Sequence, residues 1–136
     1  MTATSVDTVG DGVPDWWRAK YFGGDGRSTT STSLASGDPD HDGVDNHHEY
    51  LADTDPTSAS SWFHLRSISL SGAFSVSYQS SASRKYTLYS TADLTSGIWT
   101  AVPSQTGITG SGGVDTLADP SPTGTQRFYR VGVQVP

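Results

Sequence analysis

Hydrophobic and polar residues alternate along the second half of the chain. Phe74, Val76 and Tyr78 fall on one side of an extended segment, and the serines and the glutamine of the same segment fall on the other. A period of two residues is typical of a β-strand with one face buried and the other in water. The sequence therefore predicts a strand over residues 74–79.

Similar segments predict an all-β arrangement from residue 61 to residue 136. They cover residues 63–70, 86–90, 98–102 and 127–135. The apolar spacing slips between Leu65 and Ile68, which indicates a β-bulge in the first of these strands. Glycine and serine separators at 71–72 and 110–113 recur at the intervals of a sandwich fold, so we expect about six or seven short antiparallel strands. The predicted fold class is mainly β, with a small antiparallel β-sandwich.

Residues 1–60 follow a different pattern and form a separate predicted domain. Two short helices, over 16–22 and 46–52, each follow a loop rich in aspartate and glycine. Between them, residues 23–37 are mostly glycine, serine and threonine, a composition typical of a surface loop or linker without a packed core. The chain is thus expected to divide into a helical domain, 1–60, and a β domain, 61–136.

The loop before the second helix has the ligand spacing of a calcium site. In such a loop, oxygen ligands come from positions 1, 3, 5, 7, 9 and 12, and position 6 is glycine. The sequence DPDHDGVDNHHE, residues 38–49, places glycine at position 6 and an oxygen donor at every ligand position. The predicted calcium ligands are Asp38, Asp40, Asp42, the carbonyl of Val44, Asn46 and Glu49. An acidic surface turn that binds no ion would explain the glycine, but not the spacing of the carboxylates.

An earlier loop, residues 7–18, has the same frame with two departures. Val9 stands at position 3 and Arg18 at position 12, where acidic residues are expected. This second site is either weak or empty, or it recruits a ligand from elsewhere in the fold. Asp55 is the candidate for that ligand, and the alternative role of Asp55 is an Asx turn before Pro56. The candidate ligands of this site are Asp7, Asp11, the carbonyl of Val13, Asp15 and Asp55.

These two stretches resemble a known class of calcium repeats. The pair GDGVPDWW and DPDHDGVDNHHEYLADTDPT, within residues 7–57, is similar to dockerin-like and thrombospondin type 3-like repeats of secreted bacterial proteins. In such families each loop precedes one helix, as in a half EF-hand, and the resemblance implies a structural, extracellular calcium module. The β domain resembles fibronectin type III and related sandwiches through FSVSY, KYTLY and RFYRV.

Composition and charge exclude several classes of function. The chain has no cysteine, which rules out disulfides and thiolate metal sites. Residues 1–61 hold eleven acidic and three basic residues, whereas a nucleic-acid partner needs a basic surface. No apolar run is long enough for a membrane span, and the start of the chain lacks the pattern of a signal peptide. We expect a monomeric fragment of a larger protein, and the resemblance to the calcium repeats implies a location outside the cell or on its surface.

Catalysis is not expected, because the clustered carboxylates are already assigned to calcium. His41, His47 and His48 could suggest zinc, but His47 and His48 are adjacent on a helix and cannot share a face. The predicted function is therefore that of a non-catalytic, calcium-stabilised accessory module.

Three aromatic residues are candidates for ligand binding by the β domain: Trp62, Tyr89 and Trp99. Exposed rings on a sheet can stack on sugars, so a polysaccharide is one expected partner. Alternatively, these rings seal the joint between the two domains. The alternative function is that of a structural spacer or a protein-docking unit, as dockerins are, which would bind a partner protein through the helix faces around Trp17, Tyr21 and Tyr50.

Overall fold

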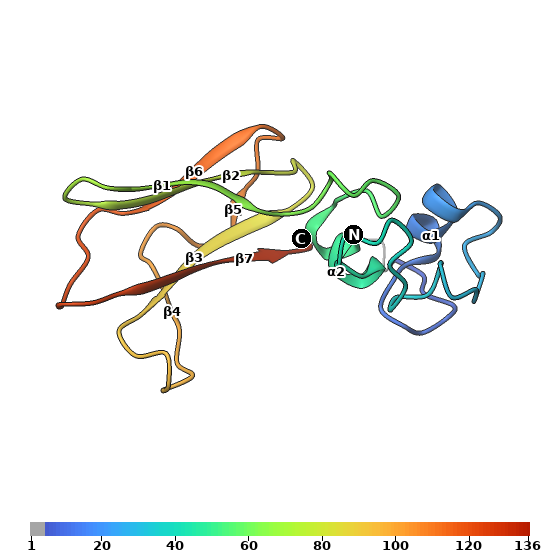
Figure 1. The fold of residues 1–136 in the computed structure, drawn as a ribbon, viewed down its shortest axis with the longest axis horizontal. Helices are drawn as coiled ribbons and strands as arrows, with labels where there is room; N and C mark the ends of the chain where they lie inside the picture. The colour runs from blue at the N-terminus through green and yellow to red at the C-terminus, as the bar shows by residue number, and fades with distance from the viewer. Residues whose placement is uncertain (1–4) are drawn as a thin grey trace. The chain divides into compact units, whose positions relative to one another are not determined.

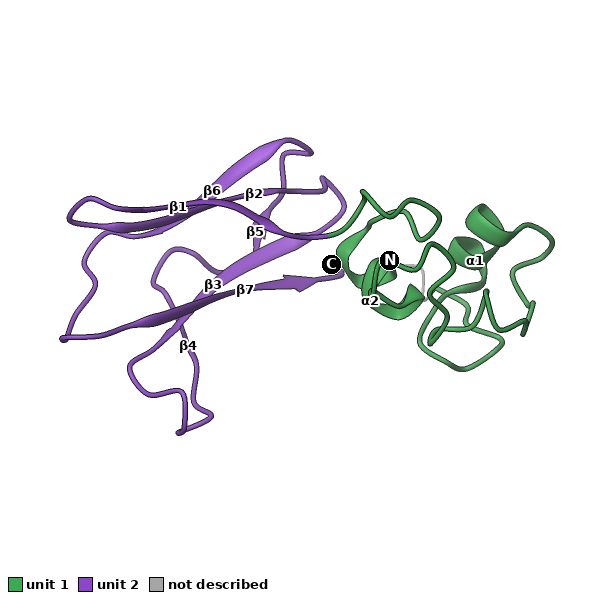
Figure 2. Ribbon diagram, viewed as in Figure 1, with its two compact units in different colours: residues 1–62 green, residues 63–136 purple. Residues whose placement is uncertain are grey.

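The computed structural model describes residues 5–136, which divide between residues 62 and 63 into two compact units, called unit 1 and unit 2 (Figure 2). The division lies two residues beyond the boundary expected from the sequence. Over these described residues, no helix is long and apolar enough to cross a membrane.

Unit 1 contains two short helices, α1 (Asp15–Phe22) and α2 (Asn46–Ala52). The side chain of Asp45 accepts a hydrogen bond from the His48 amide and caps the N-terminus of α2. Trp17 is fully buried and lies edge-on to Tyr50, with ring centroids 6.1 Å apart, so this contact joins the two helices. The predicted helices are present, and α1 begins one residue earlier than expected.

The segment 23–37 is an irregular loop in which most residues are exposed, as its composition predicted, but hydrogen bonds hold it against the rest of unit 1. Ser33 is buried, and the backbone carbonyls of Thr32 and Leu34 accept hydrogen bonds from the Asn46 side chain at 2.8 and 2.7 Å. Main-chain groups, rather than apolar side chains, hold this segment. A small polar sequence gave no sign of these contacts.

Unit 2 is mainly β and consists of two antiparallel sheets, arranged like a small β-sandwich (Figure 1). One sheet has the order β1-β2-β6. In the other, β3 pairs with β7 along its length and with β4 and β5 at its two ends. The strands are β1 (Leu65–Leu70), β2 (Phe74–Gln79), β3 (Lys85–Thr91), β4 (Thr100–Ala101), β5 (Ile108–Thr109), β6 (Val114–Asp119) and β7 (Phe128–Gln134).

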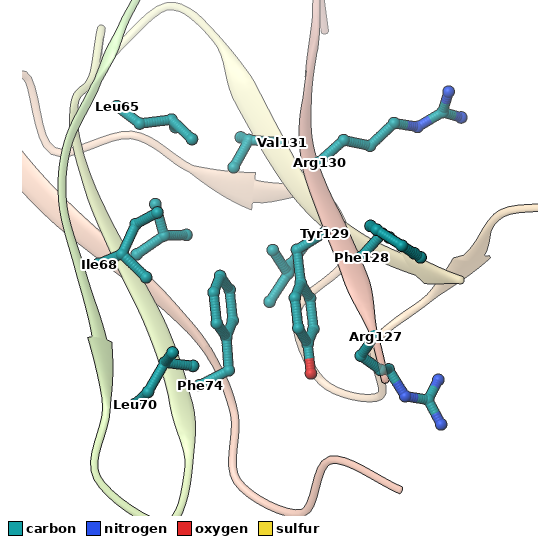
Figure 3. A pocket seen from close by; sticks show the side chains of 11 residues that line it. Leu65, Ile68, Leu70, Phe74, Arg127, Phe128, Tyr129, Arg130 and Val131 are labelled. Atoms are coloured by element: carbon teal, nitrogen blue, oxygen red, sulfur yellow. The ribbon is translucent and has the colours of Figure 1, made fainter. Parts of the chain in front are cut away.

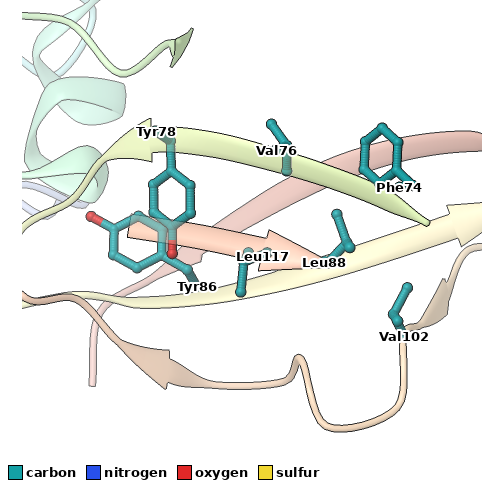
Figure 4. Close-up of a cluster of buried hydrophobic side chains, with 7 residues drawn as sticks. All are labelled: Phe74, Val76, Tyr78, Tyr86, Leu88, Val102 and Leu117. Carbon is teal, nitrogen blue, oxygen red and sulfur yellow. The ribbon is translucent and has the colours of Figure 1, made fainter. Parts of the chain in front are cut away.

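The core of unit 2 lies between the sheets, where β2 buries the three residues that alternation had placed on one face (Figure 4). Its buried members are Phe74, Val76, Tyr78, Tyr86, Leu88, Val102 and Leu117. The register between β1 and β2 shifts between Leu65 and Ser67, which confirms the predicted bulge. A strand was predicted over 98–102, but only the two residues of β4 are in strand conformation there.

Two buried tyrosines of this core predict a matched pair of stability effects. The hydroxyl of Tyr78 is buried without a hydrogen-bond partner, whereas that of Tyr86 accepts a hydrogen bond from the Ser81 amide at 2.8 Å. Tyr78→Phe removes an unsatisfied polar group and should be neutral or stabilising, whereas Tyr86→Phe should cost about 1 kcal/mol. Urea unfolding followed by circular dichroism measures both changes. Equal destabilisation by the two substitutions would contradict the assignment.

Candidate metal centre

The loop 38–49 wraps around its own carboxylates before it enters α2. His41 and Gly43 have φ angles of 62° and 91°, left-handed conformations that turn the chain sharply. One oxygen of each aspartate is used within the loop: the amides of Gly43, Asp42 and Val44 donate to Asp38, Asp40 and Asp42 at 3.0, 3.3 and 2.8 Å. These bonds fix the direction of the three carboxylates.

The second oxygen of each aspartate is buried and has no hydrogen-bond donor in the protein. These atoms are Oδ1 of Asp38, Oδ2 of Asp40 and Oδ2 of Asp42. One carboxylate oxygen from each of the three residues lies within 4.8 Å of the others. Within the described chain, this is the one group of three or more acidic or histidine side chains whose geometry could hold an ion.

Asn46 and Glu49 add further buried oxygens without partners. The Asn46 side chain is fully buried, and because its amide nitrogen donates to Thr32 and Leu34, its Oδ1 is the free end. Glu49 is also fully buried, and neither of its carboxylate oxygens has a hydrogen-bond partner; the nearby Thr54 hydroxyl donates to the main-chain carbonyl of Glu49 at 3.5 Å. A buried acceptor left unsatisfied costs about 1–3 kcal/mol, and more when charged.

The pKa values of the loop carboxylates also show that their negative charges are poorly balanced within the protein. Burial raises the pKa of Glu49 to about 7, and the negative charges of Asp40, Asp42 and Asp55 add to this rise. The pKa of Asp40 is also raised, first by burial and then by the neighbouring carboxylates of Asp42 and Asp38. An arrangement of this kind favours protonation unless a cation balances the charge.

The donor set fits a hard divalent cation. Carboxylate and amide oxygens from Asp38, Asp40, Asp42, Asn46 and Glu49 are the ligand type of calcium. Val44 is half-buried in the same loop, and its carbonyl as a sixth ligand stays a prediction.

Without a bound cation, the high pKa of Glu49 predicts that unit 1 loses stability as pH rises. Below pH 4.5 both the folded and the unfolded chain carry a protonated Glu49, whereas above pH 7 the folded state must bury the charge. The difference between 4.5 and about 7 corresponds to about 3 kcal/mol lost over this window. Urea unfolding in EGTA at several pH values measures it, and Glu49→Gln should flatten the profile. A profile that rises between pH 5 and 7.5 would contradict the prediction.

The loop 7–18 does not fit a metal ion in the same way. Every carboxylate oxygen of its three aspartates accepts a hydrogen bond from the protein. Asp7 accepts from the amides of Gly10 and Gly12, Asp15 accepts from Thr8, and Asp11 accepts from Val13, Arg18 and Ala35. The carbonyl of Val13 also accepts a hydrogen bond, from Arg18 at 3.3 Å. The candidate ligands of this loop therefore already have hydrogen-bond donors in the protein, and their carboxylates do not form a cluster like that of Asp38, Asp40 and Asp42.

Asp55 forms the Asx turn that was the alternative to metal binding. Its Oδ1 accepts hydrogen bonds from the amide and the hydroxyl of Thr57, at 3.0 and 2.6 Å. Its charge acts on the pKa of Glu49, which associates it with the loop 38–49.

The histidines near the loop form other contacts. His48 Nδ1 lies 2.6 Å from Asp45 Oδ1, and the ring of His47 lies against Gly12, where an added Cβ would be 3.1 Å away. His41 is exposed. The three histidines therefore contact different groups.

Two of the three candidate aromatic residues lie together in unit 2. The guanidinium carbon of Arg130 is 4.6 Å from the ring centroid of Trp99 and 5.1 Å from that of Tyr89. Both rings are half-buried. Trp62 belongs to unit 1 and is 46% exposed. The sequence did not identify Arg130, because only the pairing of β3 with β7 brings it to the two rings.

An apolar groove of about 320 Å³ opens between β1 and β7, and Figure 3 shows its walls. Leu65, Ile68 and Leu70 from β1 line it with Tyr129 and Val131 from β7. Each of these strands pairs on one side only among the described strands, so the groove follows an open edge of the sandwich. Its β1 side chains are exposed by 44–77%.

Comparisons of the chain with protein-family models, curated proteins and solved structures found no match.

Proposed function

We propose that this protein is a calcium-stabilised, non-catalytic accessory module of a larger secreted or surface protein. The supporting observation is the set of buried, unpartnered oxygens on Asp38, Asp40, Asp42, Asn46 and Glu49, at the spacing of a calcium loop. The ion would be held by these side chains and the Val44 carbonyl, as the spacing of a calcium loop predicts. Its role would be to balance the charge of the loop and hold α2 in place.

Calcium suits this donor set better than the other common divalent ions. Calcium accepts six to eight oxygen ligands in flexible geometry, whereas magnesium keeps several waters and zinc prefers nitrogen and sulfur. An ion that binds only the folded chain stabilises it by about 2.7 kcal/mol at a hundredfold excess over its dissociation constant. Millimolar extracellular calcium lies in the range of modules with weak sites, which favours an extracellular location.

Isothermal titration of the chelator-treated protein with calcium, and separately with magnesium, tests the proposal. We expect calcium to bind at the loop 38–49 and Asp40→Asn to weaken binding at least about tenfold, because it removes one charged ligand. Asp25→Asn is the matched control, since its exposed carboxylate lies in the same unit but outside the loop. Equal affinity in both variants, or no binding at all, would refute the site.

A second candidate function is carbohydrate binding by the Tyr89–Arg130–Trp99 cluster. Aromatic rings supply stacking surface, and the exposed Arg130 supplies hydrogen-bond donors for hydroxyl groups. Trp99→Ala should abolish retention on a polysaccharide affinity gel, whereas Ile98→Ala, at an exposed neighbouring position, should not. If the unmodified chain is retained on no glycan, the spacer or protein-docking role is favoured instead.

A further inference from the structure

The two aspartate loops of unit 1 have the same backbone frame, 31 residues apart. Position 4 has φ near 70° in both (Gly10 76°, His41 62°), and position 6 has φ near 90° (Gly12 93°, Gly43 91°). The amide of position 6 donates to the aspartate at position 1, and the amide of position 7 donates to the aspartate at position 5, in each loop. Both helices begin at position 9.

The two loops differ in the residue at position 12. In the loop 38–49 it is Glu49, fully buried with two unpartnered oxygens. In the loop 7–18 it is Arg18, also fully buried, whose guanidinium donates to Asp11 Oδ1 at 2.7 Å and to the carbonyl of Val13 at 3.3 Å. Asp11 and Val13 hold positions 5 and 7, which are ligand positions of a calcium loop.

We propose that Arg18 is a built-in replacement for the metal ion of the first loop, so that this loop takes no calcium. Its charge meets the carboxylate and the carbonyl that an ion would otherwise bind. Val9 at position 3 agrees with this role, because a single positive charge needs fewer carboxylates than a divalent ion. The expectation of one calcium per chain rests on the proposed function, whereas the absence of calcium from the first loop does not.

The remaining donors of Arg18 explain how the buried charge is accommodated. Nε donates to the carbonyl of Ser33 at 2.9 Å, and Nη1 donates to that of Gly26 at 3.1 Å. Gly26 has no room for a side chain, since an added Cβ would lie 1.8 Å from the carbonyl oxygen of Asp15. The segment 23–37 thus folds over Arg18 and supplies the carbonyl groups that satisfy it.

Calcium stoichiometry of three proteins tests the inference: the unmodified chain, Val9→Asp, and Val9→Asp/Arg18→Glu. We expect one ion for the first two, because Arg18 still fills the loop, and two for the double variant, in which both acidic positions are restored. A second ion in the unmodified chain, or no gain in the double variant, would overturn the inference. If the unmodified chain binds none and the double variant binds one, the proposed function fails while the inference stands.

An NMR measurement on the unmodified protein covers the case in which the double variant does not fold. On titration with calcium, the amide signal of Gly43 should shift with a single saturable step. Because the His47 ring lies against Gly12, any shift of the Gly12 signal should follow that same step. Saturable movement of Gly12 at a separate calcium concentration would show an ion in the first loop and overturn the proposal.

Discussion

Glu49→Gln is expected to have opposite effects on unit 1 in calcium and in chelator. In millimolar calcium the substitution should lower the stability of the unit, because it removes the charged ligand at position 12. In EGTA at pH 8 it should raise the stability, because it removes a fully buried carboxylate that has no hydrogen-bond partner and whose pKa is about 7. One substitution should therefore reverse sign with the ion.

The two effects are of similar size. In chelator at pH 8, removal of the buried charge should recover up to about 3 kcal/mol, less the cost of burying a neutral amide. In calcium at a thousandfold excess over the dissociation constant, the stabilisation of about 4 kcal/mol by the ion should be largely lost. Thermal midpoints should shift in both conditions by several degrees.

Tryptophan fluorescence can follow unit 1 by itself. In a Trp99→Phe background, the remaining tryptophans lie in unit 1, so thermal or urea unfolding reports on that unit. Asp25→Asn in the same background is the control and should move neither midpoint by more than about 0.5 kcal/mol, since its side chain is exposed. Destabilisation by Glu49→Gln in both conditions would indicate a structural role for Glu49 without calcium.

The sequence predicted most of the elements whose signal lies in apolar spacing. Alternation located β2 over its full length and identified the bulge in β1. It missed β6, because Leu117 is the only apolar residue of that strand that is buried to the core, while Val114 is exposed. It also missed β5, whose two residues are both exposed.

The clustering of the three aspartates in the loop 38–49 was predictable from residue spacing, whereas the contacts of Arg18 were not. Spacing identifies which residues can turn inward, and Asp38, Asp40 and Asp42 do gather. A cation at position 12 could be interpreted from the sequence only as a missing ligand. Its partners are mainly backbone carbonyls, from Val13, Gly26 and Ser33, and main-chain acceptors leave no trace in a side-chain pattern.

Arg18→Met is expected to destabilise unit 1 strongly whether or not calcium is present. The methionine fills part of the same volume. However, the Asp11 carboxylate and the backbone carbonyls of Val13, Gly26 and Ser33 lose the hydrogen bonds that they accept from Arg18. Removing one partner of a buried ion pair costs about 3–5 kcal/mol. Burial acts to raise the pKa of Asp11, but hydrogen bonds from the Ala35 amide and from Arg18 keep this pKa below its usual value, so part of this stability should disappear below about pH 4 in the unmodified chain as well.

Arg27→Met is the matched control for this substitution. Arg27 also faces an aspartate of the first loop, with its Nε 3.7 Å from Asp15 Oδ2, but its side chain is 60% exposed, and such a pair contributes about 0–1 kcal/mol. We expect urea unfolding in the Trp99→Phe background to show a large loss for Arg18→Met and almost none for Arg27→Met, in calcium and in EGTA alike. A loss for Arg18→Met that calcium restores would mean that an ion can take over the first loop once the guanidinium is gone, with Asp7, Asp11 and Asp15 as its carboxylates. Destabilisation independent of calcium would instead show that the loop needs the geometry of the guanidinium as well as its charge, because Val9 leaves too few oxygens to bind an ion in its place.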